Sequence, residues 1–77
     1  NISEKDEIDP NITIEYHQNK GTIKINNTLP SVINIYSVSG QLLYHNNFKN
    51  TLNFNIDYGG LILINVTNDN SVLTEKH

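Results

Sequence analysis

The chain has 77 residues, 36% of them apolar and 17% charged, with a net charge of −3 and no cysteine. This length provides one small domain, and without disulfides its core supports only about 3–5 kcal/mol of stability. Five lysines, no arginine and eight acidic residues leave no basic surface for nucleic acid or an anionic membrane surface. The longest apolar run, residues 61–64, is far shorter than the ~20 residues of a membrane span, so we expect no membrane insertion.

The amino-acid usage favours strands over helices. The chain contains 14 Asn, 11 Ile, 7 Leu and 6 Thr but no Ala, Arg, Met or Trp. Ala and Arg are good helix formers, whereas Ile, Val, Thr and Tyr suit strands. We therefore expect an all-β domain.

Residues 1–10 have the composition of a linker. The first nine carry five of the thirteen Lys, Asp and Glu side chains of the chain, and Pro10 follows. Such a polar segment, closed by a residue that disfavours helix before it, is typical of a connection between domains. Because the chain does not begin with Met, we expect an acidic linker, 1–10, that joins the domain 11–77 to the rest of a longer protein.

The first alternation of apolar and polar residues predicts a hairpin. Apolar residues occupy every second position in 12–16 and again in 23–25. The intervening residues 17–21 have the composition of a turn, in which Gly21 is expected to supply a positive φ.

The strongest hairpin signal spans residues 32–45. Residues 31–38 are apolar on both faces, which is typical of a strand inside a sheet. Gly40 lies in the short connection that follows, where backbone freedom is needed, and residues 41–45 form the returning strand. Tyr36 and Leu42 are expected to fill the core.

The second half of the chain predicts shorter strands. Residues 46–50 are polar and read as a loop, and residues 52–57 alternate strictly, which predicts a strand with one face in water. A corner at 58–60, a strand at 61–66, a turn at 67–70 and a last strand at 71–75, with Val72 and Thr74 inward, complete the chain. Seven strands at this spacing favour an antiparallel β-sandwich, because parallel strands would need crossovers for which the chain is too short.

The residues that could carry chemistry are scattered. His17, His45 and His77 share no metal-ligand spacing. The acidic residues of 1–10 lack the glycine and the ligand spacing of a calcium loop. Ser37, Ser39, His45 and Asp57 include the types of a catalytic triad, but the glycine-framed nucleophile turn is absent. We expect no enzymatic activity, no catalytic residues, no metal and no cofactor.

Two segments carry a resemblance to a known family. Residues 33–43 match the pattern of a strand with Ile35, Tyr36 and Gly40 at its hallmark positions, and residues 55–66 match a later pattern in which Gly60 precedes an apolar strand. Residues 23–76 thereby resemble the type A C-terminal sorting domain of the type IX secretion system of Bacteroidota. The family closes on a short strand and basic residues, here reduced to Lys76 and His77, and Ile62 stands where the family usually has Tyr.

The resemblance implies a seven-stranded immunoglobulin-like β-sandwich that acts as a secretion and sorting signal. Such domains take their cargo from the periplasm to the outer-membrane surface or the medium, and a signal peptidase typically removes them there. The implied partners are the type IX translocon, the C-terminal signal peptidase and the N-terminal cargo domain. The cut would fall near residues 1–9 or just upstream of them. Ile35, Tyr36, Gly40 and Gly60 would set the shape, and Lys76 would be recognised.

Two alternatives stay open on the sequence. The chain could be an immunoglobulin-like accessory or adhesion module of a larger surface protein or secreted enzyme, packing on its neighbour or binding glycans through exposed Asn, Tyr58 and Phe48. It could also associate through an edge strand at residues 71–75, because an unpaired strand edge can pair with another chain.

Overall fold

The structure is a computed structural model that describes residues 11–77. The linker expected at residues 1–10 lies outside the described residues. Within them the chain forms seven strands and no helix. The strands are β1 (Ile12–His17), β2 (Lys20–Ile25), β3 (Pro30–Ser37), β4 (Leu42–Lys49), β5 (Thr51–Asn55), β6 (Ile62–Thr67) and β7 (Val72–Lys76).

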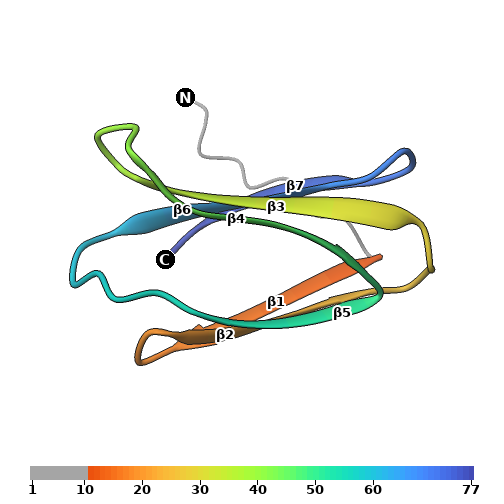
Figure 1. Ribbon diagram of the computed structural model, residues 1–77, viewed down its shortest axis with the longest axis horizontal. Helices are drawn as coiled ribbons and strands as arrows, with labels where there is room; N and C mark the ends of the chain where they lie inside the picture. Colours follow the sequence, from red (N-terminus) through yellow and green to blue (C-terminus); the bar gives the residue numbers. More distant parts are fainter. Residues whose placement is uncertain (1–10) are drawn as a thin grey trace.

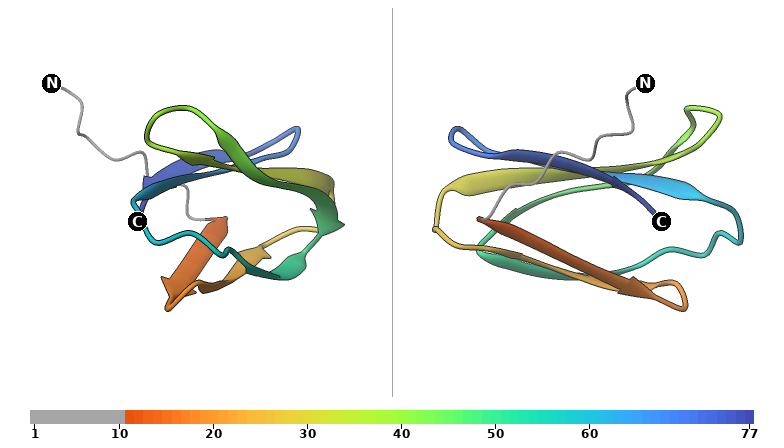
Figure 2. Two further views of the ribbon diagram at one scale, coloured as in Figure 1. Left: turned by 60° about the vertical axis from the view of Figure 1, so that its left-hand side comes forward. Right: turned by 180° about the vertical axis from the view of Figure 1, so that it is seen from behind.

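The strands form two antiparallel sheets, which confirms the expected seven-stranded β-sandwich. One sheet has the order β1-β2-β5 and the other β4-β3-β6-β7, and the two layers face each other in every view (Figure 1, Figure 2). The second strand lies beside the fifth and the third beside the sixth, as in immunoglobulin domains. The fourth strand lies beside the third, whereas in constant-type immunoglobulin domains it lies beside the fifth.

The core is built mainly from isoleucine. Alternate residues of each strand point inward, so the strands contribute one face each to the space between the sheets. β-Branched side chains fit this pleated surface well, which explains why an Ile-rich chain forms strands. The buried apolar residues are Ile12, Ile23, Ile25, Ile33, Ile35, Phe54, Ile56, Ile62, Ile64, Val66 and Leu73.

The first hairpin differs from expectation in its turn. Gln18 and Asn19 have φ of 52° and 69° and form a two-residue connection between the paired His17 and Lys20, a geometry that suits the twist of a hairpin. Gly21 lies within β2 instead and has no positive φ. Its role is spatial, because a Cβ there would lie within 3 Å of three ring carbons of Phe54.

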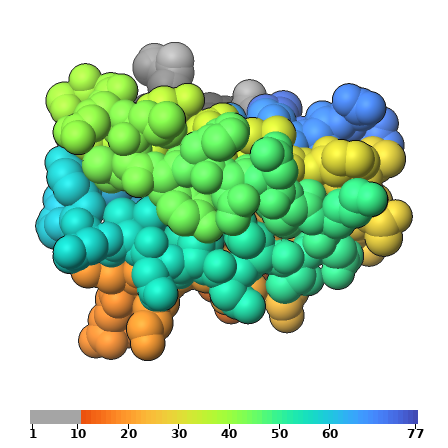
Figure 3. Space-filling model, in the orientation of Figure 1, coloured from red at the N-terminus to blue at the C-terminus, as the bar shows by residue number. Residues whose placement is uncertain are grey.

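The polar segment 46–50 is mostly strand, which corrects the expected loop. β4 pairs with β3 as far as Lys49 opposite Pro30, and Asn50 alone separates β4 from β5. Asn50 has φ of 66°, and its Nδ2 donates to the carbonyl oxygens of Ile25 at 2.8 Å and Asn27 at 3.3 Å. One asparagine therefore turns the chain from one sheet into the other, and β4 and β5 cover this side of the sandwich (Figure 3).

A bulge in the second hairpin corrects the expected placement of Tyr36 and Leu42. Ile35 pairs with Tyr44 but Tyr36 pairs with Leu42, so Leu43 is the extra residue. Leu43 and Tyr44 both pack against the core, while Leu42 is 52% exposed. Tyr36 is half-buried and lies on the face of β3 opposite the buried Ile35.

In the last strand, the inward and outward positions are the reverse of those expected. Leu73 is buried, whereas Val72 is 49% exposed and Thr74 is exposed. The β6–β7 turn sets these positions, because Thr67 pairs with Val72 and the amide of Asn68 donates to the carbonyl oxygen of Ser71.

The side opposite the β4–β5 corner is closed by the end of the chain. His77 continues the ladder through two backbone hydrogen bonds with Ile62, each 2.9 Å. Its ring meets the Tyr16 ring edge-on with centroids 5.8 Å apart, and its Nε2 lies 2.8 Å from Glu75 Oε1. Nowhere in residues 11–77 is there a helix long and apolar enough to cross a bilayer.

Candidate functional site

The outer face of the four-stranded sheet carries the candidate site. Its side chains form rows across the strands, because residues paired in register point to the same face of a sheet. The row nearest the β3–β4 turn, here called the apolar row, runs Leu42, Tyr36, Leu63, Lys76 across β4, β3, β6 and β7.

Two further rows follow along the strands. The middle row is polar and consists of His45, Asn34, Asn65 and Thr74. His45 Nδ1 lies 2.6 Å from Asn34 Oδ1, and Asn65 Nδ2 donates to Thr74 Oγ1 at 2.9 Å. The third row consists of Asn47, Val32, Thr67 and Val72.

Exposed apolar side chains concentrate at this sheet. Among residues 11–77, the large apolar residues with high exposure are Val38, Leu42, Leu61 and Val72. Leu42 and Val72 lie on the outer face, and Val38 and Leu61 lie just past the last β3–β6 pair, Ser37 with Ile62. Leu42 and Val72 lie on the two edge strands of this sheet, with the middle row between them, so the exposed apolar positions of residues 11–77 belong to this sheet and its ends rather than to the other one.

The outer face of the three-stranded sheet is different in kind. Every strand position on it is polar or charged, which is the normal composition of a solvated face. These positions are Thr13, Glu15, His17, Lys20, Thr22, Lys24, Thr51, Asn53 and Asn55. The two faces of the sandwich are therefore chemically unequal, and the four-stranded face is the candidate interaction face.

The interaction face is also unusual in charge. Lys76 lies in the apolar row, and no Asp or Glu occupies a position in the three rows, although the chain carries a net charge of −3. Among the carboxylates of residues 11–77, Glu15 lies on the other sheet, Asp57 and Asp69 follow β5 and β6, and Glu75 pairs with the buried Ile64 and bonds His77.

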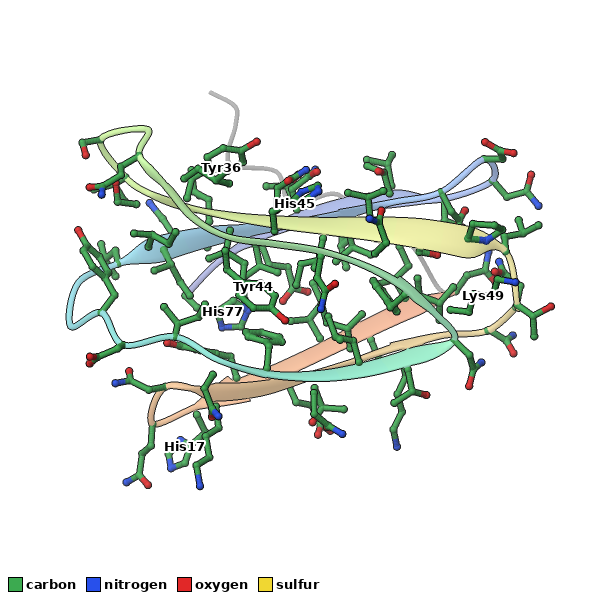
Figure 4. All side chains as sticks on the ribbon, viewed as in Figure 1. His17, Tyr36, Tyr44, His45, Lys49 and His77 are labelled. Atoms are coloured by element: carbon green, nitrogen blue, oxygen red, sulfur yellow. The ribbon has the colours of Figure 1, made fainter. Side chains whose placement is uncertain are left out.

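The five residues singled out from the sequence fall into three environments. Tyr36 and Lys76 both lie on the interaction face, on either side of Leu63, and Figure 4 shows Tyr36 pointing away from the other sheet. Ile35 is fully buried. Gly40 is in the β3–β4 turn with φ of 99°, and Gly60 is exposed beside the Tyr58 ring.

Gly40 belongs to a turn that is tied together by hydroxyl groups. The Gly40 amide donates to the Ser37 carbonyl oxygen at 2.9 Å. The buried Ser37 Oγ accepts from the Gln41 amide at 3.1 Å and lies 2.9 Å from Ser39 Oγ. These bonds hold the bulge beside the turn and so fix the exposed position of Leu42 at the edge of the apolar row.

Reactive side chains do not converge in the described part of the chain. His17 lies at the tip of the first hairpin, His45 on the interaction face and His77 between the sheets (Figure 4). No group of three or more His, Asp or Glu residues that could hold a metal occurs within residues 11–77. The hydroxyl groups of Ser37 and Ser39 bond to each other, while His45 bonds Asn34.

The hollows of the described surface are shallow and open. One of about 400 Å³ lies at the far end of the interaction face and is lined by Pro30, Val32, Asn47 and Lys49 among others. Another of about 420 Å³ lies over β1, β2 and β5 and includes Glu15, His17 and Lys20. Neither encloses a buried titratable group.

The aromatic residues suggested for glycan contact are not free. Phe48 and Tyr58 are half-buried and pack against the core. Leu42 and Leu63, in contrast, were missed by sequence reasoning although they flank Tyr36 on the interaction face. The only sequence signal for them was the presence of apolar residues on both faces of the expected strands.

Comparison of the sequence with models of known families and with curated proteins gave no match.

Proposed function

We propose that residues 11–77 form a C-terminal secretion and sorting domain that the type IX export machinery recognises as a folded surface. In this role the domain acts through a surface rather than through catalysis. Its cargo would pass from the periplasm to the outer-membrane surface or the medium, where a signal peptidase would remove the domain.

One observation carries this proposal. The two segments that resemble the family are far apart in sequence, yet they form β3 and β6, which pair from Val32 with Thr67 to Ser37 with Ile62. β7 then pairs with β6 and places Lys76 beside Leu63, in the same row as Tyr36. Most of the residues that carry the resemblance thus lie on neighbouring strands of one sheet, while Gly40 and Gly60 lie in the connections beside it. This arrangement supports recognition through the exposed face of that sheet.

The proposal is tested by export of an inert cargo. Residues 1–77 are fused to the C-terminus of a periplasmic reporter in a bacterium that has the type IX machinery, and the reporter's location and mass are measured. We expect the reporter at the surface or in the medium with about 8.7 kDa removed. The matched control is the same reporter without residues 11–77, which should stay in the periplasm.

Two substitutions separate recognition from folding. Ile35→Asp places a charge in the core and should abolish export by unfolding the domain. Lys76→Glu changes an exposed side chain and should reduce export while the fusion stays folded. If the unsubstituted fusion is folded, uncleaved and remains in the periplasm, the proposal is overturned and the accessory module is favoured.

A further inference from the structure

The interaction face has dimensions that suit a short segment of a partner. Tyr36 and Pro30 are six residues apart on β3, which corresponds to about 20 Å at 3.3 Å per residue. Four strands at a spacing of about 4.8 Å span roughly 15 Å. Such a flat area is smaller than one side of a standard protein interface, so it suits a short segment and a transient contact.

The side chains of the interaction face indicate which kind of segment it can bind. Tyr36, Leu42 and Leu63 offer apolar area at one end. The three rows contain one side chain that is always charged at neutral pH, the ammonium of Lys76, and His45 lies in the next row. Because the three rows carry Lys76 and no carboxylate, an acidic side chain placed over Lys76 is attracted and a basic one is repelled, although the chain as a whole has a net charge of −3.

A second copy of this chain fits the face poorly. Two copies placed face to face would gain no opposite charges, since both present Lys76 and neither has a carboxylate in the three rows. The outer face of the three-stranded sheet has Lys20 and Lys24 against Glu15 alone, so it also lacks the charge that would complement Lys76.

We propose that the apolar row with Lys76 binds a short acidic segment of a partner protein. Apolar side chains of the segment pack against Tyr36, Leu42 and Leu63, and one of its carboxylates pairs with Lys76. This binding goes beyond the sorting role, and its test does not depend on that role.

The test uses the whole chain and two peptides of matched design. Both peptides have ten residues with Leu and Phe at the same positions, and the intervening positions are Glu in one and Lys in the other. Binding to the ¹⁵N-labelled protein is followed by amide chemical shifts. We expect the acidic peptide to shift Tyr36, Leu42, Leu63 and Lys76, with affinity about tenfold above that of the basic peptide, the equivalent of 1.4 kcal/mol.

Variants assign the effect to the face. Lys76→Glu should lower the affinity for the acidic peptide about tenfold, and Leu42→Thr should lower it several-fold. Leu42→Thr should leave the core intact, because the Leu42 side chain is already half exposed. The matched control is Lys24→Glu, which makes the same charge change at an exposed position of the other sheet and should leave the affinity unchanged. The urea midpoint of each variant verifies that it is folded.

Several results would overturn the proposal. Equal binding of the two peptides, shifts that map to β1, β2 and β5, or an equal loss with Lys24→Glu would each do so. Shifts around Asn34 and His45 with a neutral oligosaccharide such as cellohexaose, but none with the acidic peptide, would assign the face to carbohydrate. Shifts that depend on protein concentration alone would assign it to a second copy.

Discussion

At the residue scale, a neighbouring aromatic ring, rather than a special backbone conformation, explains why residue 21 is glycine. It pairs with Tyr16 on β1 and Phe54 on β5. The rings of these two residues stack with centroids 6.1 Å apart and an interplanar angle of 12°. The ring of Phe54 occupies the space that a Cβ on Gly21 would need, so the glycine is required by packing.

Gly21→Ala should therefore destabilise the domain by about 1–3 kcal/mol through overpacking, as measured by urea unfolding. Gly59→Ala is the matched control, because a Cβ at Gly59 meets nothing within 4 Å, and a change of about 0.5 kcal/mol or less is expected there. In a Phe54→Leu background the cost of Gly21→Ala should fall. An equal cost in both backgrounds would show that the ring is not the cause.

Asn50 combines a left-handed backbone with two side-chain hydrogen bonds. Asn50→Gly keeps the backbone conformation and loses the bonds to Ile25 and Asn27. Asn50→Ala loses the bonds and also strains the positive φ. We expect Asn50→Ala to lower the free energy of unfolding by about 1 kcal/mol more than Asn50→Gly does. Equal urea midpoints for the two variants would contradict this account of the corner.

At the scale of the element, β3 has two faces with separate roles. Ser31, Ile33, Ile35 and Ser37 point inward and are buried, while the residues between them point to the interaction face. An apolar residue on the outward face therefore contributes to the surface more than to the core. The bulge at Leu43 extends this division into β4.

Substitutions on the two faces of β3 should differ in cost. Ile35→Ala removes a fully buried side chain and should cost about 2–5 kcal/mol. Tyr36→Ala removes a half-buried side chain whose neighbours are cross-strand partners, and should cost about 1 kcal/mol or less. Urea unfolding of the two variants checks this order. A cost for Tyr36→Ala as large as that for Ile35→Ala would place Tyr36 in the core.

At the scale of the whole molecule, both sheets share one core and are joined on two sides. Asn50 connects β4 to β5 directly, and the Tyr16–His77 contact links the opposite edges. Neither sheet can bury its inner face alone, because each depends on the isoleucines of the other.

The two sheets should therefore unfold together, with a stability of about 3–5 kcal/mol for a domain of this size. Amide signals of Ile23 in one sheet and Ile64 in the other should disappear at the same urea concentration. Two separate midpoints would mean that the sheets are independent units.

The sequence by itself determined the strand content, most strand positions and the central place of β3. Alternation and composition were sufficient because successive side chains of a strand point to opposite faces, so a short stretch of sequence already shows the apolar–polar alternation. It also indicated the segments around Tyr36 and Gly60. These features depend on local preferences that each short stretch of chain carries.

Only the tertiary structure decided which residues share a face. The bulge at Leu43 and the β6–β7 turn each reverse the inward and outward positions that follow them, and a shift of one residue exchanges the two faces of a strand. The row of Leu42, Tyr36, Leu63 and Lys76 comes from four strands, and their register is set by pairing and core packing rather than by local sequence. The interaction face is for this reason a property of the assembled sheet.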